Sequence, residues 1–518
     1  MPIKPPSGRL EISAGELKAL QRRIKERNLL ESDWQMVHAM SEVVQCLSEI
    51  IEEKNTSIGR LCKYLLGAPT ETAKNILPQK EKSRGDQPHK APIKGHGRKA
   101  ASAYVSADRV RIEHPELKPG ALCPGCEKGK VYPLSLPSFF VHIKGASPLK
   151  ATVYERARLR CNLCGDVYVP ELPPDVQGDK YDDSATAMIG FLKYGCGLPF
   201  YRIEKLQANL GSPVAASTQW DVLNSAALPL LPVYDTLINY AAQGETIHND
   251  DTTMKVLAFL KEQDPESTRK GIYTTGIVSK WQGRLIALFM TGRQHAGENM
   301  TDLLKRRATG LSPPIQMCDA ATRNVSKQFE VILANCLTHA RRQFVELVDR
   351  FPDDCAYVIE QLGKVYHFDD LTKEQGLSDE ARLVYHQEHS GPVMAELESW
   401  CKQQLEEKIV EPNSGLGKAI TYMLNHWKKL TRFLQVPGAP LDNNLCERAL
   451  KYAIINRKNA MFYKTQRGAY VGDLFMSLIH TCQLAGTNPL AYITWLLKNS
   501  REIEKSPQSY MPWNYTQG

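Results

Sequence analysis

Apolar residues near the start of the chain recur in alternating three- and four-residue steps, which is the spacing of a coiled-coil seam. Only Lys54 interrupts the seam. Its eight positions are Val37, Met40, Val44, Leu47, Ile51, Ile58, Leu61 and Leu65. The pattern predicts that residues 1–66 form N-terminal helices with a leucine-zipper-like coiled coil that dimerises the chain. The alternative is an amphipathic helix that packs on its own domain.

Beyond residue 240 the pattern changes to short strand-like runs. Strands are predicted at residues 246–249, near 271–279 and 284–291, at 315–318 and near 331–337, and helices near 296–307 and from 321. Three antiparallel strands followed by alternating strand and helix is the order of an RNase H-like α/β core. We therefore predict a multidomain α/β protein with a catalytic core in residues 241–350 and 435–480. A helical insertion at 351–434 interrupts this core, and a helical tail follows at 481–518.

Residues 176–240 read as a short helix, a glycine turn and a second helix with a polar face. This is the pattern of a helix-turn-helix-like DNA-binding region, although an all-helical subdomain looks the same.

Residues 67–103 are rich in Lys, Arg, Gly and Pro and poor in apolar residues. This composition predicts a flexible basic linker. Lys94, Arg98 and Lys99 are candidate contacts to DNA phosphates; the alternative is a solvated tether.

Four of the thirteen cysteines form two Cys-x-x-Cys pairs within residues 104–175. They are Cys123, Cys126, Cys161 and Cys164. Four thiolates in two such turns suit one tetrahedral, structural Zn²⁺. The alternatives are chance pairs or a redox dithiol. The other nine cysteines are scattered singly, as expected of reduced thiols in a cytoplasmic protein.

The net charge of +8 is modest, but the cations cluster in the linker and around residues 451–464, which favours a polyanionic partner. No run of about 18 apolar residues occurs, and the N-terminus lacks the apolar core of a signal peptide. We therefore expect no membrane association and a cytoplasmic protein that joins the nucleoid when bound to DNA.

Three acidic positions carry the candidate chemistry. Asp250, followed by Asp251, and then Asp319 each come at the end of a predicted strand, and Glu447 lies in the first turns of a helix. Cations surround Glu447, and these candidate phosphate contacts are Arg448, Lys451, Arg457 and Lys458. An acid among cations suits a metal bound next to phosphate. Read singly, each acid is equally an ordinary turn, cap or solvated side chain.

Six ordered segments make the chain resemble the IS66-family transposases. They include IHNDDTTMKVL, QMCDAATRN, NCLTHARRQFVEL and LDNNLCERALKYAIINRKNAMFYKT. The resemblance implies a bacterial insertion-sequence transposase whose DDE triad maps onto Asp250, Asp319 and Glu447. The family commonly has Glu after its first Asp, where this chain has Asp251, so Asp250 and Asp251 both remain candidates for the first metal ligand. It also implies a homodimer or higher synaptic oligomer and small accessory proteins of the same element.

Phosphodiester cleavage and strand transfer need an activated oxygen nucleophile and a stabilised leaving oxygen, which two Mg²⁺ (or Mn²⁺) ions provide. Three carboxylates can hold such ions. His339, Arg341 and Arg342 are further candidate contacts to DNA, although His339 is equally a structural histidine. Two rival functions remain: a catalytically inactive or domesticated zinc-ribbon regulator, and a metal-dependent nuclease that only hydrolyses DNA.

Overall fold

The computed structural model describes residues 101–104, 107–134, 138–176, 180–261 and 271–516, together with residues 20, 22–24, 30, 32–34 and 37. The chain divides into two compact units. The first comprises Met1–Gln79 and Gln343–Gly363, and the second comprises Lys80–Arg342 and Lys364–Gly518. The coiled-coil seam beyond Val37 and the linker cations Lys94, Arg98 and Lys99 lie outside the described residues.

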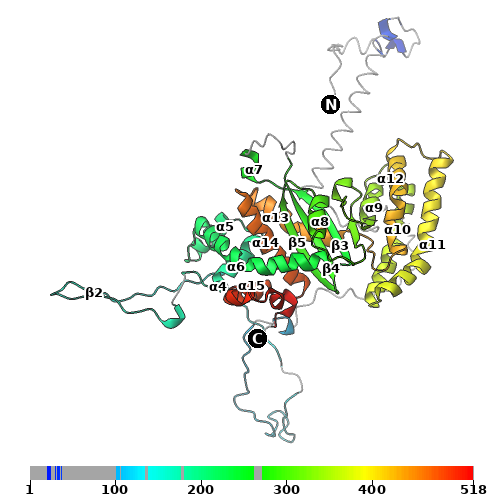
Figure 1. The fold of residues 1–518 in the computed structure, drawn as a ribbon. Coiled ribbons are helices and arrows are strands. Elements are labelled where there is room, and N and C mark those ends of the chain that lie inside the picture. Colours follow the sequence, from blue (N-terminus) through cyan, green and yellow to red (C-terminus); the bar gives the residue numbers. More distant parts are fainter. Residues whose placement is uncertain are drawn as a thin grey trace. The chain divides into compact units, whose positions relative to one another are not determined.

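A five-stranded mixed sheet lies at the centre of the second unit (Figure 1). Its strands are β3 (Thr246–Thr253), β4 (Tyr273–Trp281), β5 (Arg284–Gly292), β6 (Ile315–Cys318) and β7 (Ile332–Asn335), in the spatial order β5-β4-β3-β6-β7. Strands β5, β4 and β3 are antiparallel, whereas β3, β6 and β7 run parallel. The sheet and its helices confirm the mixed α/β class expected from the sequence.

Two local features differ from the predicted elements. Strand β3 continues to Thr253, so Asp250 and Asp251 lie within the strand instead of after it. The helix predicted from residue 321 is only a single 3-10 turn, η4 (Thr322–Asn324). The strand is extended because β4 pairs with it along its whole length.

Helices cover both faces of the sheet. Helix α13 (Asn444–Ala460) packs on β3 and β4, as does α8 (Ala296–Leu304), while α6 (Ala216–Ala242) packs on β4 and β5. One continuous hydrophobic core joins these helices to the sheet and to the C-terminal helices. The core therefore spans segments that are far apart in the sequence.

The remaining elements are short or peripheral to the site. The second unit begins with η1 (Ala101–Ala103), β1 (Leu159–Arg160), β2 (Val167–Tyr168), η2 (Pro174–Val176), α4 (Asp183–Gly190), the π-helix η3 (Phe191–Gly195) and α5 (Phe200–Asn209). Helix α7 (Leu257–Lys261) follows β3, and α9 (Leu337–Val345), α10 (Pro352–Glu374), α11 (Asp379–Glu406), α12 (Gly415–Leu430) and η5 (Arg432–Leu434) precede α13. The C-terminal elements are α14 (Gln466–Leu484), α15 (Pro489–Lys498), α16 (Ser500–Ile503), η6 (Pro507–Tyr510) and η7 (Pro512–Asn514).

Helix α14 covers the outer edge of β5. Its side chains, at four-residue spacing, accept hydrogen bonds from the strand. The backbone N–H groups of Thr291, Phe289 and Ala287 donate to Asp473, Ser477 and Thr481, respectively. Four residues of helix and two residues of strand advance by similar lengths, roughly 6 and 7 Å. The edge strand is thus satisfied without a further strand, which removes a template for aggregation.

Helix α6 corresponds to the second helix of the region predicted to resemble a helix-turn-helix. Leu223, Leu230 and Leu237 recur every seven residues and are fully buried. Gln219 is also buried, and its amide donates to the carbonyls of Phe200 and Val214. One face of the helix therefore belongs to the core, and DNA contact through its other face stays a prediction.

Helices α10 to α12 fill residues 352–430, where the sequence predicts a helical insertion. Over the part of the chain that the structure describes, every helix is too short or too polar to cross a membrane.

Candidate metal and active site

Asp250 and Asp319 stand side by side on neighbouring parallel strands. The register of β3 and β6 pairs Thr246 with Ile315 and His248 with Met317. Continued by two residues, it places Asp250 level with Asp319, directly after the end of β6. Both residues are an even number of positions from His248 and Met317, so their side chains project from the same face of the sheet.

A single amide group joins the two carboxylates. The Asn324 side-chain nitrogen lies 3.2 Å from Asp250 Oδ1 and 2.7 Å from Asp319 Oδ1. The two carboxylate oxygens are therefore no more than about 6 Å apart, because both contact the same atom. Asp250 Oδ1 also accepts from the backbone N–H of Asp251, and Asp319 Oδ1 accepts from that of Ala321.

Helix α13 brings Glu447 towards these acids by close contact with β4. Gly276 on β4 pairs with Asp250 on β3, and an added Cβ at Gly276 would lie 2.9 Å from the Leu450 side chain. The Cys446 thiol, one residue before Glu447, donates to the Gly276 carbonyl at 3.2 Å. The helix approaches this closely because Gly276 has no side chain.

The charges of the site act on Asp250. Burial raises the pKa of its carboxyl to about 7, and the negative charges of Asp319, Asp251 and Glu447 add to this effect. The hydrogen bond from the Asp251 N–H lowers the pKa and only partly offsets the rise. A bound cation would offset the repulsion that these negative charges exert on the ionised Asp250 carboxylate.

Asp251 points away from this group. Its carboxylate lies 2.9 Å from His295 Nδ1, 3.4 Å from the backbone nitrogen of Ala296 and 3.7 Å from Arg323. His295 and Ala296 begin α8. Adjacent residues of a strand face opposite sides, so α8 and α13 cover opposite faces here. Asp250, and not Asp251, is the residue that lies beside Asp319.

Glu447 also lies beside a histidine and a cysteine. Its Oε1 is 3.7 Å from His339 Nδ1, and both atoms are buried without a hydrogen-bond partner among the described residues. With Cys336 Sγ, the three potential ligand atoms lie within 4.8 Å of one another. The sequence reading missed Cys336, although Cys336 and His339 form a Cys-x-x-His motif at the start of α9.

Asn443 fixes the start of α13 to the sheet and to this cluster. Its amide donates to the Asn249 carbonyl at 3.1 Å, and its Oδ1 lies 3.1 Å from His248 Nδ1. Its backbone N–H donates to Cys336 Sγ at 3.2 Å. Burial lowers the pKa of His248 to about 4, so this imidazole is neutral at physiological pH.

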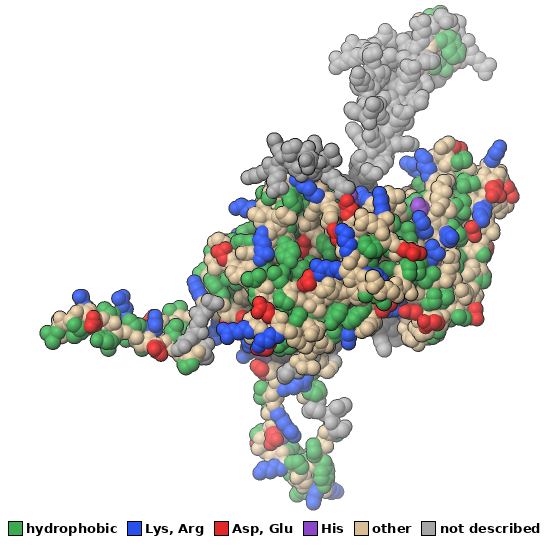
Figure 2. All heavy atoms as spheres, viewed as in Figure 1, with side chains coloured by type: hydrophobic (Ala, Val, Ile, Leu, Met, Phe, Trp, Pro, Cys, Tyr) green, Lys and Arg blue, Asp and Glu red, His purple; other side chains and the backbone are tan. Residues whose placement is uncertain are grey.

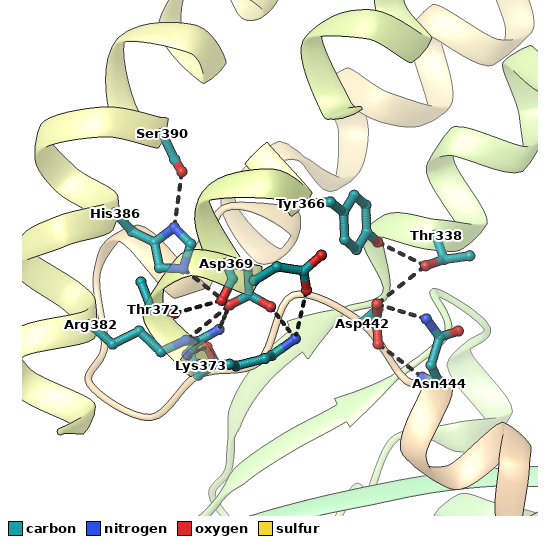
Figure 3. A network of polar contacts seen from close by, with 12 residues as sticks. Thr338, Tyr366, Asp369, Thr372, Lys373, Arg382, His386, Ser390, Asp442 and Asn444 are labelled. Atoms are coloured by element: carbon teal, nitrogen blue, oxygen red, sulfur yellow. Dashed lines mark hydrogen bonds and ion pairs between the residues drawn. The ribbon is translucent and has the colours of Figure 1, made fainter. Parts of the chain in front are cut away.

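The helical insertion holds the segment before α13 through two polar contacts (Figure 3). Thr338 Oγ1 lies 2.8 Å from the Tyr366 hydroxyl and 3.5 Å from Asp442, and Asp442 accepts from the Asn444 backbone N–H. Arg382 donates to the Ala439 carbonyl.

The guanidinium of Arg382 also donates to the buried carboxylate of Asp369 (Figure 3). Asp369 also contacts His386 at 3.2 Å and Lys373 at 2.6 Å. Burial alone would raise the pKa of Asp369, but these hydrogen bonds and ion pairs hold it well below its usual range. The ionised carboxylate thus links α10 and α11 to the segment that leads to Glu447.

The predicted DNA-contacting cations fall into two groups. Arg448, Lys451 and Lys458 on α13 are exposed. Arg457 instead binds Thr252 Oγ1 and the carbonyl of Thr253 at the end of β3. Arg341 is only 9% exposed, and Arg342 is half-buried. On the face drawn in Figure 2, basic and acidic side chains are interspersed, so no surface of a single charge stands out there.

A cavity of about 430 Å³ opens on the side of the sheet that Asp251 faces. It is lined by His295 and Arg323, which contact Asp251, and by Lys305, Lys327, Glu298 and Asp302, of which Lys305 and Asp302 form an ion pair at 2.6 Å. The sequence reading did not single out these cations.

The two cysteine pairs each form a compact turn. The N–H groups of Cys164 and Leu163 lower the pKa of the Cys161 thiol to about 7, and those of Lys128 and Gly129 lower the pKa of Cys126. Amides directed at sulfur suit thiolate ligands. Among the described residues, the only three ligand atoms that lie within 4.8 Å of one another are those of Cys336, His339 and Glu447, so the four thiols do not gather into one centre.

The chain is similar in sequence to several known proteins. The family model described as "Transposase IS66 family" matches residues 179–471, which is more than half of the sequence. Three proteins of Sinorhizobium fredii are also similar. The uncharacterized protein y4jD is 24% identical over 514 residues, covering 91% of this chain and 96% of that protein. The uncharacterized protein y4qI is 25% identical over 522 residues (96% and 88%), and y4hP is 28% identical over 356 residues (64% and 61%).

Proposed function

This chain belongs to the IS66 transposase family, and on that premise we propose that it is an insertion-sequence DNA transposase that cuts transposon ends and joins the freed 3′-OH to target DNA. In this proposal its sheet is an RNase H-like catalytic core. The strand order β5-β4-β3-β6-β7 supports that assignment.

One observation carries the proposal: Asp250, within β3, and Asp319, directly after the adjacent parallel strand β6, share a single amide donor. Glu447 is near enough to contribute to the raised pKa of Asp250. Asp250 and Asp319 are 69 positions apart in the sequence, so two acids that share one amide donor need a common reason to be so close. Binding of cations supplies that reason.

Asp250, Asp319 and Glu447 are the proposed ligands of divalent cations. An all-oxygen donor set fits Mg²⁺, or Mn²⁺, better than softer metals. Such ions supply an activated oxygen nucleophile and stabilise the leaving oxygen. The contact of Asp251 with His295, on the other face of the strand, supports Asp250 over Asp251 as the first ligand.

The other residues of the site bind DNA or position the acids. Arg448, Lys451 and Lys458 are the proposed phosphate contacts on α13, and Lys94, Arg98 and Lys99 remain proposed contacts in the linker. Arg457, Arg341 and Arg342 were predicted to touch DNA as well; the bonds of Arg457 to β3 and the burial of Arg341 favour supporting roles. His339, whose Nδ1 lies 3.7 Å from Glu447 Oε1, is proposed to position Glu447.

We further propose one structural Zn²⁺ bound by Cys123, Cys126, Cys161 and Cys164. The lowered pKa values of Cys126 and Cys161 support thiolate formation in both turns. Dimerisation through residues 37–65, a synaptic oligomer on DNA, accessory proteins and a cytoplasmic location also remain proposals.

The two rival functions make different demands on the molecule. A zinc-ribbon regulator does not require Asp250 and Asp319 to lie together, so the contact of both with Asn324 disfavours it. A nuclease requires the same acids and differs only in lacking strand transfer.

The decisive experiment uses the full chain and a labelled duplex carrying the end of its own element. Glu447→Gln removes one charge with little change of shape, so cleavage and strand transfer should fall by several orders of magnitude. Binding to the duplex should survive, with its steep salt dependence, because phosphate contacts dominate affinity. Glu504→Gln, at an exposed position outside the site, is the matched control.

Undiminished strand transfer by Glu447→Gln would exclude Glu447 as a ligand. Cleavage without strand transfer by the wild type would establish the nuclease, and specific binding without cleavage would establish the regulator.

A further inference from the structure

Asn324 is buried with its carboxamide between two acids, and only one end of that carboxamide is satisfied. Its side chain is fully buried, and its nitrogen contacts both Asp250 and Asp319. Its Oδ1 is buried without a hydrogen-bond partner among the described residues. Leaving a buried polar atom unpaired is costly, so such an atom calls for an explanation.

The two ends of a carboxamide have the same shape. A rotation of about 180° around the last side-chain bond exchanges nitrogen and oxygen without moving the backbone. It would place Oδ1 where the nitrogen now lies, 3.2 and 2.7 Å from the two carboxylate oxygens. Neighbouring oxygens around octahedral Mg²⁺ are roughly 2.9 Å apart, given metal–oxygen bonds of 2.0–2.1 Å. The observed separations bracket that value.

We propose that Asn324 is a further metal ligand, which donates N–H to Asp250 and Asp319 in the metal-free protein and rotates to coordinate a divalent cation through Oδ1. This inference rests on the proposed function, because it assumes that the two aspartates bind metal. It adds a neutral fourth oxygen donor to the three carboxylates.

The backbone around Asn324 is held in place independently of its side chain. The Asn324 carbonyl accepts from Asn249 Nδ2 and from Gln316 Nε2, each at 2.7 Å, and Gln316 also donates to Asn249 Oδ1 at 2.9 Å. Asn249 and Gln316 are fully buried. The carboxamide of Asn324 can therefore rotate while its Cα stays fixed beside the acids.

The test is a titration of the full-length, DNA-free protein with Mn²⁺, followed by electron paramagnetic resonance of the free ion. If Asn324 is a ligand, Asn324→Ala loses one donor and should bind Mn²⁺ about tenfold or more weakly. If Asn324 only competes with the metal by donating N–H, its removal frees the carboxylate oxygens, and Mn²⁺ binding should stay equal or become tighter. If it only orients the acids, its removal also weakens binding, and Asn324→Asp, which keeps an oxygen and loses the donor, separates that role from coordination.

Asn335→Ala is the matched control. Asn335 is 2% exposed, and its amide donates to the backbone carbonyl of Asp319, not to its carboxylate. It should lower stability while leaving Mn²⁺ affinity within about threefold of the wild type. Equal or tighter Mn²⁺ binding by Asn324→Ala overturns the inference about Asn324 and leaves the proposed function standing.

Two more variants keep the test decisive. Asn324→Asp retains an oxygen but loses the donor, so its metal-free form should melt at a lower temperature while Mn²⁺ raises its melting temperature at least as much as that of the wild type. Loss of this Mn²⁺-induced rise overturns the inference, even if Asn324→Ala does not fold. If Asp319→Asn binds Mn²⁺ as well as the wild type does, the metal site itself fails, and the proposed function fails with it.

Discussion

Gly276 on β4 lies directly opposite Asp250 on β3, and this pairing sets how closely α13 approaches the site. Cys446 and Leu450 of α13 both lie against Gly276, and Glu447 comes between them in the sequence. A residue without a side chain thus determines where a carboxylate of the site stands.

Gly276→Ala is expected to push α13 away from the sheet. The new Cβ would lie 2.9 Å from Leu450 Cγ and Cδ2, which is closer than carbon atoms pack. Overpacking of this kind lowers the free energy of unfolding by about 1–3 kcal/mol, measurable by urea denaturation. Mn²⁺ binding should weaken as Glu447 moves. Gly292→Ala on β5, where an added Cβ meets nothing within 4 Å, should have little effect on either quantity.

Asp369→Asn should destabilise the link between the helical insertion and the segment before α13. The change leaves Arg382 and His386 beside a neutral group in a buried place, and breaking such a buried pair costs about 3–5 kcal/mol of unfolding free energy. The pKa of Asp369 is lowered by folding, so its contribution exists above the unfolded pKa of 3.8 and disappears as the pH falls.

The matched control for this prediction is Asp370→Asn, one residue away on the same helix. The Asp370 side chain is 68% exposed and lies 3.7 Å from Lys373 Nζ. It should change the free energy of unfolding by no more than about 0.5 kcal/mol. Equal losses for Asp369→Asn and Asp370→Asn would refute the role of the buried carboxylate.

Asp473→Asn should remove a pH dependence of stability. Burial raises the pKa of Asp473 to about 7 from 3.8, despite two hydrogen bonds from Thr291. Because the folded pKa is the higher one, the contribution is full below pH 3.8 and is lost as the pH rises through 7. Between pH 4 and 7.5 the variant should therefore gain on the wild type by up to about 4 kcal/mol in unfolding free energy. A constant difference across this range, in urea titrations without metal, would contradict the assignment.

Cys161→Ser should abolish binding of the structural Zn²⁺. Elemental analysis of the purified wild type should give about one zinc per chain, because four thiolates complete a tetrahedral site. Cys196→Ser, which changes an exposed cysteine outside both pairs, should keep the metal. Zinc content that is unchanged in Cys161→Ser would remove this assignment.

The sequence by itself determined the classes of structure and chemistry. Its local pattern placed β6 at residues 315–318, a short run that is buried at all four positions, and a helical interval at 351–434. It also offered the three acids as candidates, because they occur in ordered segments that resemble one family, although each acid read singly is unremarkable.

Only the tertiary structure decided which side chains share a site. The choice between Asp250 and Asp251 depends on which face of β3 each side chain projects from, and that follows from the register with β6 and the positions of α8 and α13. Asn324 and Gly276 carry no signal in a single sequence, since their importance comes entirely from partners 5 to 174 positions away: Asp319 for one and Leu450 for the other. Such contacts are set by the packing of distant elements, and local pattern does not encode them.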